Sequence, residues 1–284
     1  MKIAFLGTPE FAIPSLTALQ KSRHKIVCVI TQPDAPGGRG QKLAPPPAKQ
    51  FALEHNIPVF QPENISRDLG AILAQLPEKP DILITCAYGQ ILKQNVLDAA
   101  PHGVINVHAS ILPRWRGACP VNYTLINGDR RTGVTIMQTA LGLDTGDIIL
   151  QQGTRVTPHE TAGELTARLA LIGAAVLVKA LAQIENGTAK HTPQDNTKAT
   201  RCRMLKKSDG KIDFSKSPRE VVNFIRGMNP WPGAYAPSTH GAIIVHSAHV
   251  VSHTALELDI VQSPGGRKIS YKDFLNGHKN FQFK

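Results

Sequence analysis

The first 31 residues alternate a strand pattern, a helix pattern and a second strand pattern. Lys2 to Leu6 is a short apolar run that ends at Gly7, and Ile26 to Thr31 is rich in β-branched residues. Between them, Phe11 to Lys21 carries apolar side chains at the spacing of one helix face. This order is typical of an α/β unit. We therefore predict an α/β protein whose main domain is a Rossmann-like, mostly parallel sheet.

The turn after the first strand argues against a dinucleotide cofactor. It reads Gly7-Thr-Pro-Glu-Phe11 and lacks the G-x-G-x-x-G pattern. Without those glycines the backbone offers no close cradle for a pyrophosphate. We therefore exclude a nicotinamide cofactor.

The chain is long enough for one large and one small domain. It has 284 residues, and residues 186–200 are polar and irregular. We predict a catalytic domain over residues 1–186, a linker over 187–204 and a second domain over 205–284. Short β-branched runs in the last segment favour a small OB-like β-barrel; they are Ala242–His246, Val250–Ser252, Leu256–Val261 and Lys268–Tyr271.

The positive charge is concentrated in the last third of the chain. The net charge is +11, and residues 191–284 hold 14 Lys and Arg against 7 Asp and Glu. A basic domain beside a catalytic one favours a polyanionic substrate, nucleic acid first. A solvated basic surface that only aids solubility is an equally open interpretation of charge alone.

Composition also indicates the compartment. No apolar run reaches the ~20 residues that span a bilayer, and the four cysteines show no C-x-x-C spacing. We expect a reduced, cytoplasmic, monomeric protein without membrane, metal or disulfide. The histidines at 240, 246, 249 and 253 do not change this expectation, because 246 and 249 face opposite sides of a strand and no carboxylate or Cys accompanies them.

The strongest functional signal lies between Ile105 and Asp147. Asn106, His108 and Ser110 alternate at a predicted strand end, so their side chains share one face. An amide can donate to a developing oxyanion, an imidazole can move a proton, and the Asp144 carboxylate can orient it. An ordinary strand end with a solvated His is the alternative. The nearby P-R-W-R-G loop, with an aromatic expected to be exposed, and the D-T-G-D turn favour acyl-group chemistry instead.

Two further segments are candidates for binding. Gln32 to Pro47 has no hydrophobic period, carries Arg39 and Lys42, and ends in a proline run, which predicts a mobile basic loop. Cys86-Ala-Tyr-Gly-Gln90 follows a buried strand, and its small residues leave room for a flat ligand. For Tyr88, packing in the core is an equally open interpretation.

These motifs together resemble a known family. G-T-P-E-F, the G-R-G loop, A-Y-G-Q, N-x-H-x-S-x-L-P-R-W-R-G-A, L-D-T-G-D and N-P-W-P-G are similar to the methionyl-tRNA formyltransferases, within the 10-formyltetrahydrofolate-dependent formyltransferases. The resemblance implies three catalytic residues, Asn106, His108 and Asp144. It implies folate contacts from Tyr88, Gly89, Ser110, Ile111, Leu112 and Pro113. Our candidates for tRNA contact are Arg39, Lys42, Arg114, Arg116, Lys206 and Lys207.

The resemblance implies a reaction and leaves its acceptor open. The expected activity moves the formyl group of 10-formyltetrahydrofolate to the α-amino group of methionine on initiator tRNA. The segment after N-P-W-P-G is shorter than the family's usual barrel. An amino sugar nucleotide or a purine precursor as acceptor, or a non-catalytic RNA-binding relative, are therefore the alternatives.

Overall fold

The chain forms two compact units in the computed structural model, which describes residues 1–37 and 42–283. The first unit comprises residues 1–116, 133–153 and 167–200, and the second comprises 117–132, 154–166 and the chain from 201 onward. This differs from the predicted division into 1–186, 187–204 and 205–284. Two segments, 117–132 and 154–166, pack with the C-terminal part of the chain, and most of the predicted linker packs in the first unit.

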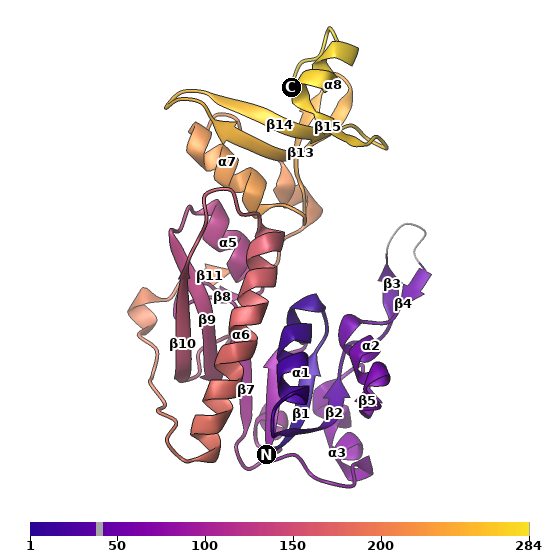
Figure 1. Cartoon of the computed structure of the whole chain (residues 1–284), viewed down its shortest axis with the longest axis vertical. Coiled ribbons are helices and arrows are strands. Elements are labelled where there is room, and N and C mark those ends of the chain that lie inside the picture. Colours follow the sequence, from indigo (N-terminus) through magenta and orange to yellow (C-terminus); the bar gives the residue numbers. More distant parts are fainter. Residues whose placement is uncertain (38–41, 284) are drawn as a thin grey trace. The chain divides into compact units, whose positions relative to one another are not determined.

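The first unit is built on the predicted α/β sheet (Figure 1). Its strands run in the order β10-β9-β7-β6-β1-β2-β5, and β7, β6, β1, β2 and β5 are parallel, whereas β9 is antiparallel to β7. The bounds are β1 Lys2–Gly7, β2 Lys25–Ile30, β5 Val59–Phe60, β6 Ile82–Cys86, β7 Val104–His108, β9 Arg131–Gln138 and β10 Ile148–Arg155. The predicted mostly parallel sheet is confirmed.

Helices cover both faces of this sheet. They are α1 Ile13–Gln20, α2 Pro47–Glu54, α3 Ile65–Gln75, α4 Gln94–Leu97 and α6 Ala162–Glu185, with short 3-10 turns at Glu10–Ala12 and Asn196–Lys198. Gly173 of α6 faces Val107 and Val134, so α6 covers the side of β7 and β9 that bears these valines. By length and composition alone α6 could cross a membrane, and half of its apolar stretch is buried in the structure.

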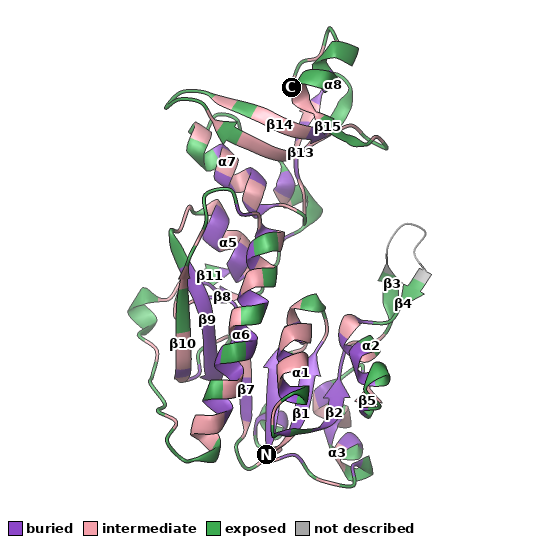
Figure 2. Ribbon diagram, in the orientation of Figure 1, coloured by how far each residue is buried: buried purple, intermediate pink, exposed green. Residues whose placement is uncertain are grey.

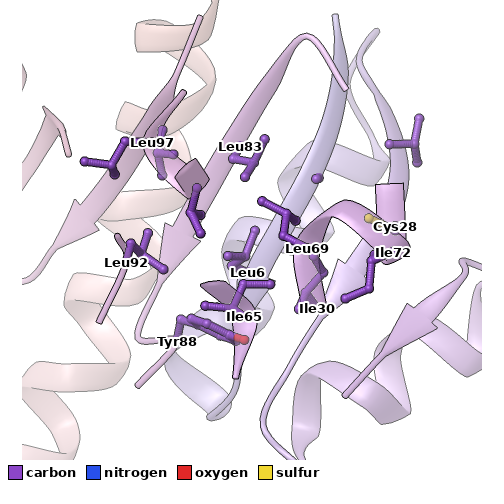
Figure 3. Packing of buried hydrophobic residues seen from close by; sticks show 14 of the residues in the cluster. Leu6, Cys28, Ile30, Ile65, Leu69, Ile72, Leu83, Tyr88, Leu92 and Leu97 are labelled. Carbon is purple, nitrogen blue, oxygen red and sulfur yellow. The ribbon is translucent and has the colours of Figure 1, made fainter. Parts of the chain in front are cut away.

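A continuous hydrophobic cluster lies between the sheet and α3 (Figure 3). Leu6, Ile30 and Leu83 point from three neighbouring strands towards Ile65 and Leu69 of the helix. The strands that carry these side chains are drawn almost entirely as buried (Figure 2). Burial of such aliphatic side chains stabilises the fold by about 1.5–3 kcal/mol each. The strand ends are therefore held on a rigid support.

The predicted mobile loop contains a two-stranded hairpin. Strand β3, Ala35–Gly37, pairs antiparallel with β4, Lys42–Ala44. The base of the hairpin is held by the Lys49 ammonium, which donates to both carboxylate oxygens of Asp34 at 2.8 Å. The segment predicted as a mobile basic loop thus contains regular structure in its described residues, and its mobility stays a prediction. Arg39 lies outside the described residues.

The second unit is a small antiparallel β domain with helices. Its main sheet has the order β12-β13-β14-β15, with every neighbouring pair antiparallel. A second short sheet pairs β8 with β11. The elements are α5 Pro120–Ile126, α7 Pro218–Gly227, α8 Tyr271–Gly277, β8 Arg116–Gly117, β11 Arg201–Cys202, β12 Ala234–Ser238, β13 Gly241–Val250, β14 Leu256–Gln262, β15 Lys268–Ser270 and a 3-10 turn at Lys207–Gly210.

The predicted small C-terminal β domain is confirmed, with a simpler topology than a barrel. Among the described residues β12 and β15 are the two edges of the main sheet, so its strands form an open meander. Strand β13 contains the predicted strand at 242–246 and ends at Val250, so the other two residues of the strand predicted at 250–252 lie in the loop after it. An aromatic cluster of Tyr271, Phe274, Phe281 and Phe283 packs against the sheet and supplies its hydrophobic cover.

Helix α5 packs in the second unit, which covers the apolar face of the helix. Tyr123 and Ile126 pack against the hydrophobic cluster of this unit. Asn122 Nδ2 donates to the Gly227 carbonyl oxygen at 2.8 Å, and Gly227 lies directly against Ile126 with no room for a Cβ. The close approach of α5 and α7 therefore depends on a glycine.

Candidate active site

Strand β7 ends beside β6 at the carboxyl edge of the parallel strands. The chain goes from β1 outward to β2 and β5, and then returns to β6 on the other side of β1. Such a reversal opens a crevice at the carboxyl ends of the strands. Asn106 and His108 alternate on β7 and pair with Met137 and Thr135 of β9. Both side chains therefore face away from the side covered by α6, as the sequence pattern predicts.

The Asn106 side chain is oriented by a neighbour on the next strand. Thr85 is its register partner on β6, and the Thr85 hydroxyl donates to Asn106 Oδ1 at 2.9 Å. In the part of the chain that the structure describes, Asn106 Nδ2 has no hydrogen-bond partner. The half-buried amide therefore presents N–H donors beside His108.

The His108 ring lies between two acceptors. Its Nε2 is 2.9 Å from the Trp115 carbonyl oxygen, and because a carbonyl can only accept, Nε2 carries the hydrogen. Its Nδ1 lies 3.7 Å from Asp144 Oδ2, and the two side chains are 6% and 13% exposed. This distance is an ion-pair contact rather than a hydrogen bond. An imidazolium at this position has an acceptor at each nitrogen.

Asp144 reaches His108 from a tight, strained turn. Its φ is +51°, a left-handed conformation that side-chain-bearing residues rarely adopt. The leucines before it, Leu141 and Leu143, are exposed. Gly146 packs so closely on the Gln138 carbonyl that a Cβ would collide with it. The predicted Asp-Thr-Gly-Asp turn is thus present, and it brings the carboxylate to the imidazole.

The Ser110 to Pro113 segment forms a turn held by internal hydrogen bonds. The Ser110 hydroxyl donates to the Arg114 carbonyl at 2.6 Å, and the Thr135 hydroxyl donates to the Ser110 carbonyl at 2.7 Å. The Leu112 amide donates to the same Thr135 oxygen at 3.2 Å, and Gln151 Nε2 donates to the Leu112 carbonyl at 2.9 Å. Ser110 and Leu112 are buried, so they shape the turn from inside.

The other two residues of this segment are partly accessible. Ile111 and Pro113 are half-buried, and the Ile111 side chain lies over Gly133 of β9. Of the four residues predicted to contact folate in this segment, these two retain exposed surface for a ligand.

The R-W-R-G loop differs from the prediction of a basic loop with an exposed aromatic. Trp115 is only 8% exposed, and its φ of +61° turns the chain inward. The Arg114 guanidinium is exposed and lies over the Trp115 ring at 4.4 Å. Arg116 is 7% exposed and faces the interior, where it donates to Gln194. Arg116 is therefore not a surface contact for tRNA, whereas Arg114 is accessible.

The remaining basic candidates fall in different places. Lys42 lies in β4, and its side chain, like the whole of Arg39, is outside the described residues. Lys206 and Lys207 are exposed at the start of a 3-10 turn in the second unit. Among the described side chains of the six candidates, Arg114, Lys206 and Lys207 are thus the exposed ones.

Tyr88 is a core residue in this structure. Its ring is 4% exposed within the cluster under α3 (Figure 3). Burial raises the pKa of its hydroxyl, which has no partner in the described part of the chain. The Tyr88 carbonyl accepts from the Thr8 hydroxyl at 2.9 Å, and Gly89 follows with φ +95°. The structure thus agrees with the interpretation of Tyr88 as a core residue, and the folate contact of this segment stays a prediction.

Three site residues were not predicted from the sequence. Thr85 orients Asn106, Thr135 holds the Ser110 turn, and Gln194 Nε2 donates to the Asp144 carbonyl at 2.9 Å. Thr85 could have been found, because it ends the strand before a polar loop in a parallel sheet. Gln194 lies in a segment without periodicity, and no sequence signal marks it.

The three candidate catalytic residues do not line the large hollow found among the described residues. A hollow of about 1020 Å³ opens at the opposite end of β7, near His102, Gln138 and His191. Its lining includes Asp98, His102 and His191, and among the described residues these three form no ion pair with one another. We therefore locate the site by its side-chain chemistry, at Asn106, His108 and Asp144. No cluster of three metal-ligating side chains occurs among the described residues.

Comparisons with known proteins identify the family of the chain. Residues 1–181 match the formyl transferase family, and residues 204–255 match the formyl transferase C-terminal domain. A methionyl-tRNA formyltransferase from Acetivibrio thermocellus is 48% identical over 236 residues, which cover 83% of this chain and 75% of the relative. The chain belongs to the methionyl-tRNA formyltransferase family. A second member, from Geobacter metallireducens, is 40% identical over 98% of this chain and 96% of its own.

Solved structures show the same fold at lower identity. The sugar 3N-formyl transferase WlaRD superposes with a TM-score of 0.68 at 21% identity, over 95% of this chain and 97% of its own. A methionyl-tRNA formyltransferase from Clostridium thermocellum superposes with a TM-score of 0.61 at 13% identity, over 95% and 99% of the two chains. These structures confirm the fold, and the sequence relatives confirm the family resemblance of the motifs and the formyltransferase activity.

Proposed function

We propose that the enzyme transfers the formyl group of 10-formyltetrahydrofolate to the α-amino group of methionine on initiator methionyl-tRNA. The observation that carries the proposal is the cluster of Asn106, His108 and Asp144 at the carboxyl end of β7. These side chains suit a formyl group, because the Asn106 amide nitrogen is an unused hydrogen-bond donor for the formyl oxygen and lies beside a buried imidazole. The co-substrate supplies a formyl carbon bonded to a nitrogen that can leave.

The enzyme accelerates this reaction mainly by holding the amine and the formyl carbon in position. An α-amine has a pKa of about 7.7–8.0, so a useful fraction is neutral at physiological pH. The neutral amine forms a bond to the formyl carbon, and negative charge builds on the formyl oxygen. Asn106 Nδ2 donates to that oxygen, in a site where the donor is already oriented by Thr85.

His108 and Asp144 transfer protons and stabilise the negative charge that develops on the formyl oxygen. An imidazolium at His108 offsets the charge on the formyl oxygen, and Asp144, 3.7 Å from Nδ1, offsets the charge of the imidazolium. As the old bond to nitrogen breaks, His108 gives a proton to the leaving nitrogen. The attacking amine releases a proton to Asp144 through water, so the number of protons balances.

Substitution of the catalytic residues tests the mechanism. Asn106→Asp removes the donor and adds a negative charge, and His108→Ala removes the proton carrier. We expect each to lower kcat by on the order of 10²–10³, because one oxyanion donor contributes about that factor. The measurement is single-turnover formyl transfer by the purified full chain, with folding checked by circular dichroism. Near-normal turnover in either variant contradicts the assignment.

The acceptor is tested by competition between substrates. Formyl transfer is measured to charged initiator tRNA, to free methionine and to a 4-amino sugar nucleotide under the same conditions. We expect transfer to the charged tRNA alone, because the accessible Arg114, Lys206 and Lys207 suit a polyanion. Transfer to the sugar nucleotide would leave the catalytic residues in place and would refute the tRNA acceptor. Salt-sensitive tRNA binding without transfer would favour a non-catalytic relative.

We also propose that the enzyme acts in the cytoplasm as a monomer. Cys28, Cys86, Cys119 and Cys202 are all free thiols in the structure, which is the usual state of cysteines in a reducing compartment. Light scattering at micromolar concentration tests the monomer, and a mass of twice 30.8 kDa would refute it.

A further inference from the structure

The Asp144 turn needs a restraint from outside itself. Asp144 has a left-handed φ of +51°, and Leu141 and Leu143 beside it are exposed rather than packed in the core. Asp adopts this conformation more readily than most side-chain-bearing residues, but it stays uncommon, so contacts from neighbouring residues help to keep the turn in this shape. The position of the Asp144 carboxylate relative to His108 therefore depends on what fixes this turn.

Gln194 supplies that restraint. Its Nε2 donates to the Asp144 carbonyl at 2.9 Å and to the Gly146 carbonyl at 2.8 Å, and it lies 4.0 Å from the Met137 sulfur. A side-chain amide nitrogen has two hydrogens, and here each meets one carbonyl of the turn. One side chain thus holds the backbone on both sides of Thr145.

Arg116 fixes the other end of the Gln194 amide. Arg116 Nε and Nη2 both donate to Gln194 Oε1, at 3.0 and 2.7 Å, and Nη2 also donates to Asn196 Oδ1 at 2.9 Å. Only an oxygen can face the guanidinium, and only a nitrogen can face the two carbonyls. The orientation of the amide is therefore determined, and the buried guanidinium has hydrogen-bond acceptors.

The same short segment also holds His108. Trp115, next to Arg116, accepts from His108 Nε2 through its carbonyl at 2.9 Å. The Trp115 amide donates to Thr200 Oγ1 and the Arg116 amide donates to the Thr200 carbonyl, both at 2.9 Å. The contacts form a closed ring that runs from His108 through Trp115, Arg116 and Gln194 to Asp144 and back to His108.

We propose that Gln194, fixed by Arg116, is a positioning residue that sets the separation of Asp144 from His108. The inference rests on the proposed function, because it assigns a catalytic use to that ion pair. Gln194 touches neither reacting group, and its effect passes through the Asp144 backbone. Arg116, whose place in the sequence suggests a tRNA contact, thereby has an internal role in the same site.

Two substitutions of similar size test the proposal. Gln194→Met removes both sets of hydrogen bonds, and Gln194→Glu places an oxygen against the two carbonyls while it keeps a partner for Arg116. We expect each to lower kcat for tRNA formylation by about 10- to 100-fold, because small misplacements of catalytic groups have effects of that order. The KM values for tRNA and folate stay within about twofold. Gln152→Met, at an exposed glutamine, is the matched control.

A double-mutant comparison separates positioning from general loss of structure. In an Asp144→Asn background, Gln194→Met is expected to lower the rate by less than about threefold further, because the pair that it positions is already lost. Full additivity of the two effects, a rate of Gln194→Met equal to that of Gln152→Met, or a loss confined to KM overturns the proposal.

An NMR measurement without substrates tests the positioning role of Gln194 independently of formyl transfer. In protein labelled at histidine, the His108 ring signals are identified by their loss in His108→Asn. We expect Gln194→Glu to move these signals while Gln152→Met leaves them in place. Unmoved signals overturn the positioning role even when formyl transfer is slow. If the wild-type enzyme does not formylate charged tRNA, the proposed function fails, whereas moved signals still support the ring of contacts.

Discussion

The orientation of one side chain amide decides whether Asn106 can act as a donor. An amide can rotate by half a turn at little cost in shape, and the two ends then exchange roles. In the structure the Thr85 hydroxyl, which also reaches the Ile105 carbonyl at 3.3 Å, donates to Asn106 Oδ1 at 2.9 Å, and this arrangement leaves Nδ2 facing the site. This bond joins register partners on neighbouring parallel strands, so the sheet itself sets the geometry.

Replacement of Thr85 by valine tests this orientation. Valine keeps the shape and removes the hydroxyl, so the Asn106 amide loses its fixed orientation. We expect kcat to fall by about 10-fold, at the lower end of the effect of second-layer partners, with unchanged KM values. Thr85→Ser keeps the hydroxyl and should stay close to wild type. Equal rates for the valine and serine variants would show that the hydroxyl does not orient Asn106.

Two arginines in one loop, separated by Trp115, differ in their exposure to solvent. Arg114 is exposed over the Trp115 ring, whereas Arg116 is buried against Gln194. The left-handed φ of Trp115 reverses the direction of the chain between them. The letters R-W-R-G indicate a basic loop correctly, but they do not indicate which arginine faces solvent.

At the scale of elements, two glycines illustrate how packing decides the effect of one substitution. Gly133 of β9 is buried, and an added Cβ would collide with the Gln152 carbonyl of β10 and with Ile111. Gly70 lies on the exposed face of α3, with nothing near its Cβ position. We expect Gly133→Ala to destabilise the enzyme by about 1–3 kcal/mol through overpacking. Gly70→Ala should stabilise it by about 0.5–1 kcal/mol.

Denaturant unfolding of the two variants beside the wild type measures both effects. The pair shares one chemical change, so any difference in sign comes from the surroundings of the site. A stabilised Gly133→Ala variant would mean that β9 and β10 can move apart without any loss in the free energy of unfolding.

The β13–β14 hairpin introduces a dependence of stability on pH. Burial lowers the pKa of His246 below 6.5, as does Lys268, while the hydrogen bond to Gln262 raises it. Below pH 6.5 the unfolded chain therefore binds more protons at this residue than the folded chain, and stability falls as the pH falls. We expect the fall in Tm between about pH 8 and about pH 5 to be smaller in His246→Gln. An unchanged fall would exclude a contribution from His246.

At the scale of the whole molecule, charge and chemistry lie in different units. Asn106, His108 and Asp144 all belong to the first unit, whereas Lys206 and Lys207 belong to the second, in the part of the chain that carries most of the net charge. A polyanion that contacts exposed lysines releases counterions, so its binding weakens as salt rises.

Neutralising one exposed lysine separates binding from chemistry. We expect Lys207→Gln to raise the KM for charged tRNA, to leave kcat unchanged and to reduce the slope of log affinity against log salt by about 1. The matched substitution Lys21→Gln, at an exposed lysine of the first unit away from the site, should change neither. Equal salt slopes for wild type and Lys207→Gln would remove Lys207 from the tRNA contact.

The sequence by itself determined the local elements and the chemistry. The strand and helix patterns of the first unit, the alternation of Asn106 and His108, and the Asp-Thr-Gly-Asp turn depend on neighbours within a few residues, and their periodicity or turn residues are visible in the chain. For the same reason the motifs indicated the formyltransferase family, which the comparisons confirm.

Only the tertiary structure decided which distant residues share an environment. Gln194 meets the Asp144 turn, α5 packs against α7, and Arg116 turns inward, although these partners lie tens of residues apart. Such contacts follow from burial and from hydrogen bonds that form only when the whole chain has folded. A polar residue such as Gln194 carries no period and no turn propensity, so its use becomes visible only in three dimensions.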